Sequence, residues 1–280
     1  MTQANVARVS VHRRRWLYLL LSISILAALS PLPVLLFINS IDVIPDLSVT
    51  PEIRAAVLDS TVLLQVGIAG ANRRDCVKDY DAAACSEAFH FGLGTILSDH
   101  LILTHDHFQV IGDDAGTLAE IQKYKWFKIR GRDGELIIST ADLTIAPESV
   151  PVGMIVLSLP ERYRLSQIGL PARVQHGLSN DDYLRRVVYY PRLGTAIDSI
   201  YPYDAAVLWQ QISVGAAHIR GVQVLNEKAL FAAQYGDEAE PLLNGDCGGG
   251  SFTLIDGAIT LLGTQNYVTP TYYLVLAVGR

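Results

Sequence analysis

The chain has 280 residues, 50% of them hydrophobic, so it is long enough to bury one large core or two small ones. Its formal net charge is −6 and its body carries no basic run, which argues against nucleic acid as the main ligand.

The first predicted element is a membrane anchor. Three arginines, at positions 13–15, precede an apolar stretch over 16–38, and no charged residue occurs between Arg15 and Asp42. This stretch is long enough to cross a bilayer, and the arginines favour a cytoplasmic tail at 1–15. We therefore expect a single-pass membrane protein with the remainder of the chain outside the cytoplasm. A cleaved signal peptide with secretion, or a buried soluble helix, are the alternatives, although Pro31 and Pro33 suit a cleavage site poorly.

Residues 39–60 are predicted to form a stalk and a short helix. Thr50, Pro51 and Glu52 have the types expected at an N-cap, a first helical position and an acidic first turn. Another short helix is predicted at 115–124.

The rest of the chain is predicted to be all-β. Short runs rich in β-branched and aromatic residues alternate with turn residues, and the runs fall into two sets that divide at about 160–170. The first set is 61–68, 89–97, 101–104, 126–130, 135–140 and 152–159; the second is 185–190, 206–214, 219–225, 251–255, 258–263 and 272–278.

The three cysteines fit an exported protein. Cys76 and Cys85 border a short polar loop, and a disulfide that closes this loop is expected in an oxidising compartment. Cys247 is then left over as an odd thiol, which a nucleophilic role would explain.

Two motifs point to chemistry. Residues 245–250 read Gly-Asp-Cys-Gly-Gly-Gly, a tight turn in which glycines let backbone N–H groups converge beside a nucleophile, as in an oxyanion hole. Upstream, residues 103–107 read Leu-Thr-His-Asp-His at the end of an apolar run, which supplies a candidate general base.

Together with Gly92-Leu93-Gly94, these motifs resemble the trypsin/chymotrypsin-like proteases over about residues 60–280. In that family a Gly-x-Gly, a Leu-Thr-x-x-His and a Gly-Asp-Ser-Gly-Gly occur in this order. The resemblance implies a chymotrypsin-like fold of two β-barrels, at about 61–160 and 165–280, with the site in the cleft between them. Cys247 replaces the family's serine.

The resemblance also implies the roles of the site residues. His107 takes the position of the base, with His105 as a second candidate, and Cys247 is the nucleophile. The N–H groups of Gly245 and Cys247 form the oxyanion hole, whereas Asp246 shapes the turn. No cofactor is implied, and the expected activity is that of a membrane-anchored peptidase.

The third member of the family's site is missing from its usual place. Gly153 stands where the orienting aspartate is expected before an apolar strand, and Glu148 or Asp142 are the remaining acidic candidates. A Cys–His dyad is chemically sufficient, because a thiolate–imidazolium pair needs less help than serine does. In this respect the chain resembles viral chymotrypsin-fold cysteine proteases.

The expected partner is a peptide or protein substrate. Pro241 occupies the position where trypsin carries the aspartate that selects basic side chains, and two leucines follow it, so an apolar pocket is expected. Residues 264–267, which include Asn266 and Tyr267, are expected to form the edge that pairs with an extended peptide.

Two other functions compete with this interpretation. The first is a catalytically inactive, protease-fold binding module, which the replaced serine and the missing aspartate favour. The second and more remote one is a zinc-dependent hydrolase, because His105 and His107 stand one residue apart as in a metallo-β-lactamase motif. Gln109 and Val110 interrupt that motif, so no metal site is expected.

Overall fold

The computed structural model describes residues 46–67, 89–105, 126–146, 155–175, 183–184, 186–193, 205–225, 228–235, 241–243, 246–268 and 272–277, all within one compact unit that runs from Ile38 to Arg280. The predicted anchor at 16–38, the loop between Cys76 and Cys85, and the predicted helix at 115–124 lie outside these residues. Among the residues described, no helix is long and apolar enough to cross a membrane.

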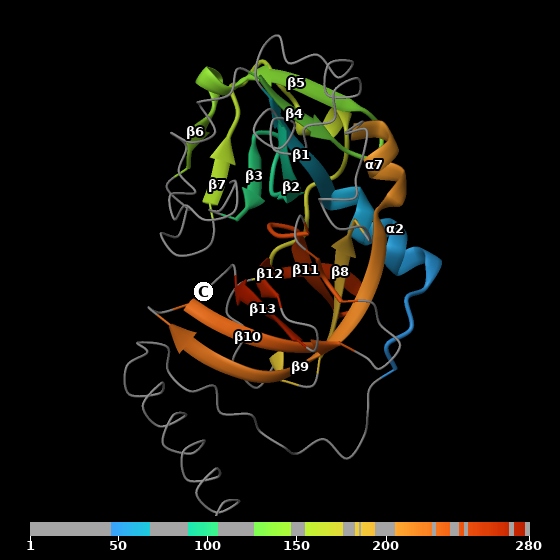
Figure 1. The fold of residues 1–280 in the computed structure, drawn as a ribbon. Helices are drawn as coiled ribbons and strands as arrows, with labels where there is room; N and C mark the ends of the chain where they lie inside the picture. The colour runs from blue at the N-terminus through green and yellow to red at the C-terminus, as the bar shows by residue number, and fades with distance from the viewer. Residues whose placement is uncertain are drawn as a thin grey trace, which may run out of the picture. The chain divides into compact units, whose positions relative to one another are not determined.

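The first half of the described chain forms a seven-stranded sheet in the order β5-β4-β1-β2-β3-β7-β6, with every pair antiparallel (Figure 1). In the part described, this sheet is open, so the expectation of a closed first barrel is not met there. Its strands are β1 (Thr61–Gly67), β2 (Phe89–Ile96), β3 (Leu101–Thr104), β4 (Trp126–Arg130), β5 (Glu135–Ser139), β6 (Thr144–Ile145) and β7 (Ile155–Ser158), with 3-10 turns at Thr140–Asp142 and Leu165–Gln167.

The second half forms the closed barrel that the sequence predicts, in the order β10-β13-β12-β11-β8-β9 (Figure 1). The hairpin between β11 and β12 turns at Asp256 and Gly257, both with positive φ, as a two-residue Asp-Gly turn requires. The strands are β8 (Val187–Arg192), β9 (Ser213–Leu225), β10 (Lys228–Tyr235), β11 (Gly250–Ile255), β12 (Ala258–Val268) and β13 (Tyr272–Ala277).

The interior of the barrel combines large rings with small side chains. Tyr190, Tyr235 and Tyr273 pack with ring centroids 5.2–5.8 Å apart, while Ala217 and Ala233 belong to the same buried cluster. Alternation of large and small residues is the usual way to fill a narrow barrel. The mainly β fold class is therefore confirmed.

One predicted strand is a helix. Residues 206–214 were expected to be extended, but α7 (Ala205–Gln211) is helical and β9 begins only at Ser213. Leu208 and Ile212 are both buried, whereas Val207 is 46% exposed. A spacing of four between buried residues is that of one helix face, and alanine and glutamine favour the helix.

The alanine-rich strand β10 was not predicted from the sequence, because alanine gives a weak strand signal.

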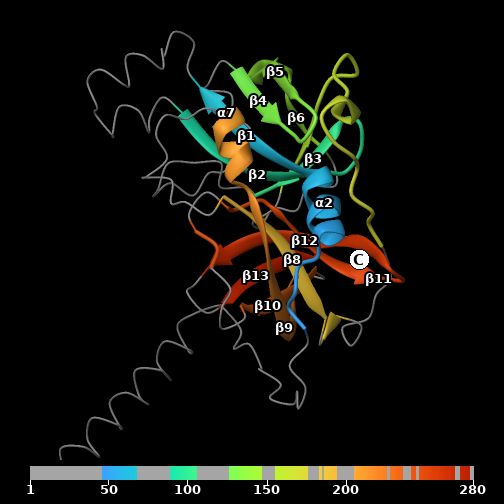
Figure 2. The ribbon, with the colours of Figure 1, turned by 90° about the vertical axis from the view of Figure 1, so that its right-hand side faces the viewer.

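Helix α2 (Pro51–Ser60) begins as predicted: the Thr50 side chain accepts a hydrogen bond from Ile53 N at 3.3 Å, and proline opens the first turn. Its buried Val57 shares a cluster with Leu103 of β3 and Phe252 of β11, so α2 packs against both sheets (Figure 2).

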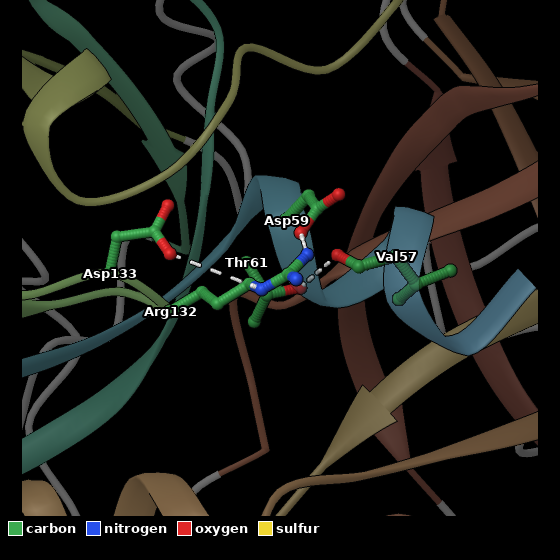
Figure 3. Close-up of polar contacts among 5 residues, drawn as sticks. All are labelled: Val57, Asp59, Thr61, Arg132 and Asp133. Atoms are coloured by element: carbon green, nitrogen blue, oxygen red, sulfur yellow. Dashed lines mark hydrogen bonds and ion pairs between the residues drawn. The ribbon is translucent and has the colours of Figure 1, made fainter. Parts of the chain in front are cut away.

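The end of α2 is bound to the first sheet. Figure 3 shows Arg132, in the turn between β4 and β5, in an ion pair with Asp59, while the Thr61 hydroxyl donates to Val57 O at 2.8 Å. Because the Arg132 side chain is 53% exposed, this pair contributes little. The backbone bond from Leu170 N to Asp59 O, at 2.7 Å, and the burial of Val57 fix the helix more firmly.

Candidate functional site

The Cys247 turn connects Asp246 to strand β11. Gly249 N donates to Asp246 O at 3.3 Å, and Gly248 N donates to Gln265 O of β12 at 3.1 Å. Gly248 has φ +86°, in the region that favours glycine. A Cβ at this position would also collide with Leu93 O and Thr104 Oγ1 and would lie 2.8 Å from His105 Cδ2. The turn is therefore pressed against the end of β3.

Leu93 links the three sequence motifs. Its N–H donates to Cys247 O at 3.1 Å, and its carbonyl accepts a hydrogen bond from the Thr104 hydroxyl at 2.8 Å. Its side chain is fully buried in a cluster with Leu63, Leu193 and Leu208 of α7. One residue of the Gly-x-Gly motif thus joins the cysteine turn to the strand of the histidine motif.

Asp246 is buried and holds the turn from the barrel side. Its two carboxylate oxygens accept hydrogen bonds from Leu193 N at 2.6 Å and Leu243 N at 2.8 Å. Burial raises the pKa of the carboxyl to about 6, opposed by the backbone donors of Leu243 and Leu193 and by the charge of Arg192. The expectation that Asp246 shapes the turn is confirmed.

The predicted catalytic pair is described only in part. Cys247 is half-buried and carries a thiol, not a disulfide. His107, Gly245 and Glu148 lie outside the described residues. His105 is 6% exposed and borders Gly248.

Asp142 lies apart from this junction. Its carboxylate forms an ion pair with Arg162. It precedes β6, where Thr144 pairs with Ser158, and Ser158 in turn pairs with Leu101 at the start of β3. His105 follows the other end of that strand, so the structure gives no support to Asp142 as a partner of the base.

The residues expected to form the substrate pocket are described only in part. Pro241 is half-buried, but the following Leu242 packs in the barrel core, and its N–H donates to Tyr235 Oη at 3.1 Å. The Leu242 side chain is therefore part of the barrel core. Asn266 and Tyr267 lie in β12, and their side chains are outside what is described.

Two residues of this arrangement were not singled out from the sequence. Leu93 was quoted only as the middle of a Gly-x-Gly, and its contact with Cys247 joins segments far apart in the chain. Gln265 was placed in a peptide-binding edge, yet its side chain is fully buried. The available signal was an amide, Gln265, that follows the mostly apolar start of β12, but it does not identify the partners.

Among the residues with described positions, no three His, Cys, Asp or Glu side chains gather as metal ligands would.

Comparison with known proteins assigns no family. No family model matches the chain, and no curated protein matches it. The chain is similar to the Rv3671c protease from M. tuberculosis in its active form, with 14% identity, TM-score 0.47 and coverage of 86% of this chain and 89% of the other.

It is likewise similar to the scabies mite inactivated protease paralogue S-I1, with 14% identity, TM-score 0.49 and coverage of 81% and 92%. The catalytically active tobacco etch virus protease gives 9% identity, TM-score 0.43 and coverage of 80% and 75%. All three TM-scores are below 0.5, so none of these likenesses gives the chain a function.

A pair of glycine substitutions tests the junction. Gly248→Ala should destabilise the protein by clearly more than Gly257→Ala, because both glycines have positive φ but a Cβ at Gly257 meets nothing within 4 Å. The matched Gly257→Ala should cost about 1 kcal/mol of unfolding free energy for its conformation alone. Urea unfolding of both variants measures the difference. Equal losses would mean that the turn does not contact Leu93 and Thr104 as described.

The buried carboxyl predicts a pH dependence. Because the folded-state pKa of Asp246 is raised from 3.8 to about 6, the folded protein binds more protons than the unfolded chain between these values. Proton binding by Asp246 therefore stabilises the folded state. This contribution is fully present below about pH 4 and is lost as the pH rises through 6, which lowers the free energy of unfolding by up to about 3 kcal/mol.

The non-titrating variant Asp246→Asn is the reference. The unfolding free energy of the parent minus that of the variant, from urea unfolding between pH 4 and about pH 8, should fall as the pH rises and level off above about pH 7. A difference that is flat or rises with pH contradicts the burial of this carboxyl.

Proposed function

We propose that this chain is a cysteine-type peptidase with a chymotrypsin-like arrangement, in which Cys247 is the nucleophile and His107 is the base. The order of the three sequence motifs supports the proposal. The observation that carries it is the junction at Leu93, which joins the Cys247 turn directly to the strand that leads into the histidine motif.

The short chain distance between this junction and His107 supports the choice of base. Gly248 borders His105, and His107 follows His105 by two peptide units, which span about 7 Å at most. In the proposed site, an imidazolium at His107 stabilises the Cys247 thiolate.

The proposed reaction is acyl transfer. The Cys247 sulfur attacks the carbonyl carbon of a peptide bond, and the N–H groups of Gly245 and Cys247 bind the oxyanion that develops. The His107 imidazolium protonates the leaving amine as the C–N bond breaks, which leaves a thioester. Water, deprotonated by the same imidazole, then attacks the thioester, and the thiolate is released.

A cysteine fits a site without an orienting carboxylate. Asp142 is paired with Arg162, and Gly153 replaces the family's aspartate. A serine alkoxide requires a well-oriented base at the moment of attack, whereas a thiolate exists before the substrate arrives. Cysteine at position 247 can therefore act without the aspartate that the family's serine requires.

Peptide-resolved thiol labelling tests the proposal. We expect iodoacetamide to modify Cys247 at pH 6 about tenfold faster than an ordinary thiol, and His107→Ala to abolish this advantage. Mass spectrometry of the unreduced peptides reads Cys247 separately from Cys76 and Cys85, and His105→Ala is the matched control for loss of a histidine. Cys247→Ser should lose peptidase activity against a peptide library.

Three results would contradict the proposal. They are an unreactive Cys247 in the parent, labelling that His107→Ala leaves unchanged, and a serine form as active as the parent. The last would mean that a third residue orients the base. An unreactive thiol together with no turnover would instead favour the inactive binding module, which the missing aspartate also supports.

A further inference from the structure

Gln265 lies on β12, and its side chain is fully buried beside the Cys247 turn. Its main chain binds the turn at two points. Gln265 N donates to Gly249 O at 2.9 Å, and Gln265 O accepts from Gly248 N at 3.1 Å. Neither main-chain group is therefore left for an extended peptide, so any peptide-binding edge of β12 starts at Asn266.

The side chain of Gln265 makes two more contacts in the same place. Its Nε2 donates to Gly250 O at 3.2 Å and to Pro191 O of β8 at 3.2 Å. Both acceptors are carbonyls, so the atom that faces them must be the amide nitrogen. Four hydrogen bonds from one residue thus bind three consecutive glycines of the turn and the neighbouring strand.

A buried amide is costly at this position. Gln265 Oε1 is buried and has no hydrogen-bond partner, which an apolar side chain of the same length would avoid. Packing alone would therefore favour methionine over glutamine. The two donated bonds are what glutamine adds: one binds Gly250 O of the turn, and the other binds Pro191 O and so ties the same side chain to β8.

We propose that Gln265 is a positioning residue that holds residues 247–250 in the conformation in which the Cys247 thiol reacts. Displacing a reacting group by about 1 Å costs up to a hundredfold in rate, so a turn with fewer bonds should react more slowly. The effect on peptide turnover rests on the proposed function, whereas the effect on the geometry of the turn does not.

The test compares Gln265→Met with Thr95→Val. Thr95 is also fully buried, and its Oγ1 lies against Gly250 but has no hydrogen-bond partner. Thr95→Val therefore changes a side chain that packs on Gly250 without removing a hydrogen bond. In Gln265→Met, iodoacetamide labelling of Cys247 should slow at least about tenfold across pH 6–8, and kcat for peptide cleavage should fall more than KM changes. In Thr95→Val both should match the parent.

Gln265→Glu gives an independent signature. A protonated carboxyl still donates one hydrogen bond to a carbonyl, whereas the carboxylate donates none. The labelling rate of this variant relative to the parent should therefore fall as the pH rises, which a general loss of packing would not produce.

Amide hydrogen exchange at Gly248 separates this inference from the proposed function. In the parent this amide should exchange slowly, and in Gln265→Met it should exchange about tenfold faster while Thr95→Val stays unchanged. If Cys247 proves unreactive in the parent, the peptidase proposal fails and the exchange data alone judge Gln265. The inference is overturned if the parent and Gln265→Met show equal labelling of Cys247 and equal exchange at Gly248. If Gln265→Met does not fold, fast exchange at Gly248 in the parent overturns it instead.

Discussion

The hydrogen bond from Leu93 N to Cys247 O is the contact on which the candidate site depends. It fixes the cysteine turn against the first sheet, while the Thr104 hydroxyl on the Leu93 carbonyl fixes the strand before the histidines to the same residue. Gly248 must be glycine because the space for a Cβ is taken by Leu93, Thr104 and His105. The close approach of the two sheets and the positive φ therefore both require glycine at this position.

The barrel side holds the same turn by different means. Asp246 accepts two backbone N–H groups, and Gln265 adds four further bonds. Both residues carry a cost, because a buried carboxyl has its pKa raised to about 6 and a buried amide oxygen has no partner. Two buried polar groups at one turn are expected where geometry matters more than stability.

Local signals in the sequence predicted much of the fold. Thr50 and Pro51 located the start of α2, and the run at 101–104 matches β3. Helix α7 was mistaken for a strand because it contains Val207 and Trp209 and is followed directly by Ile212. Only the burial of Leu208 and Ile212, four residues apart, reveals the helical period. The short strand β6 was missed because its two residues give almost no pattern.

The candidate site was predictable as chemistry but not as contacts. Motif order selected Cys247 and His107, and the residue types indicated their roles. The connection through Leu93, the pairing of Asp142 with Arg162 and the burial of Gln265 depend on residues distant in sequence, whose meeting no local pattern encodes. The open first sheet is a similar case, since closure depends on how edge strands meet.

A crystal structure of the unliganded protein would measure the distance from Cys247 Sγ to the nearest ring nitrogen of His107, which decides whether the two residues form a catalytic pair. We expect a distance of about 4 Å or less, which is near hydrogen-bond reach and slightly longer than in the presence of substrate. A separation of more than about 6 Å, with no loop motion that closes it, would contradict the catalytic pair.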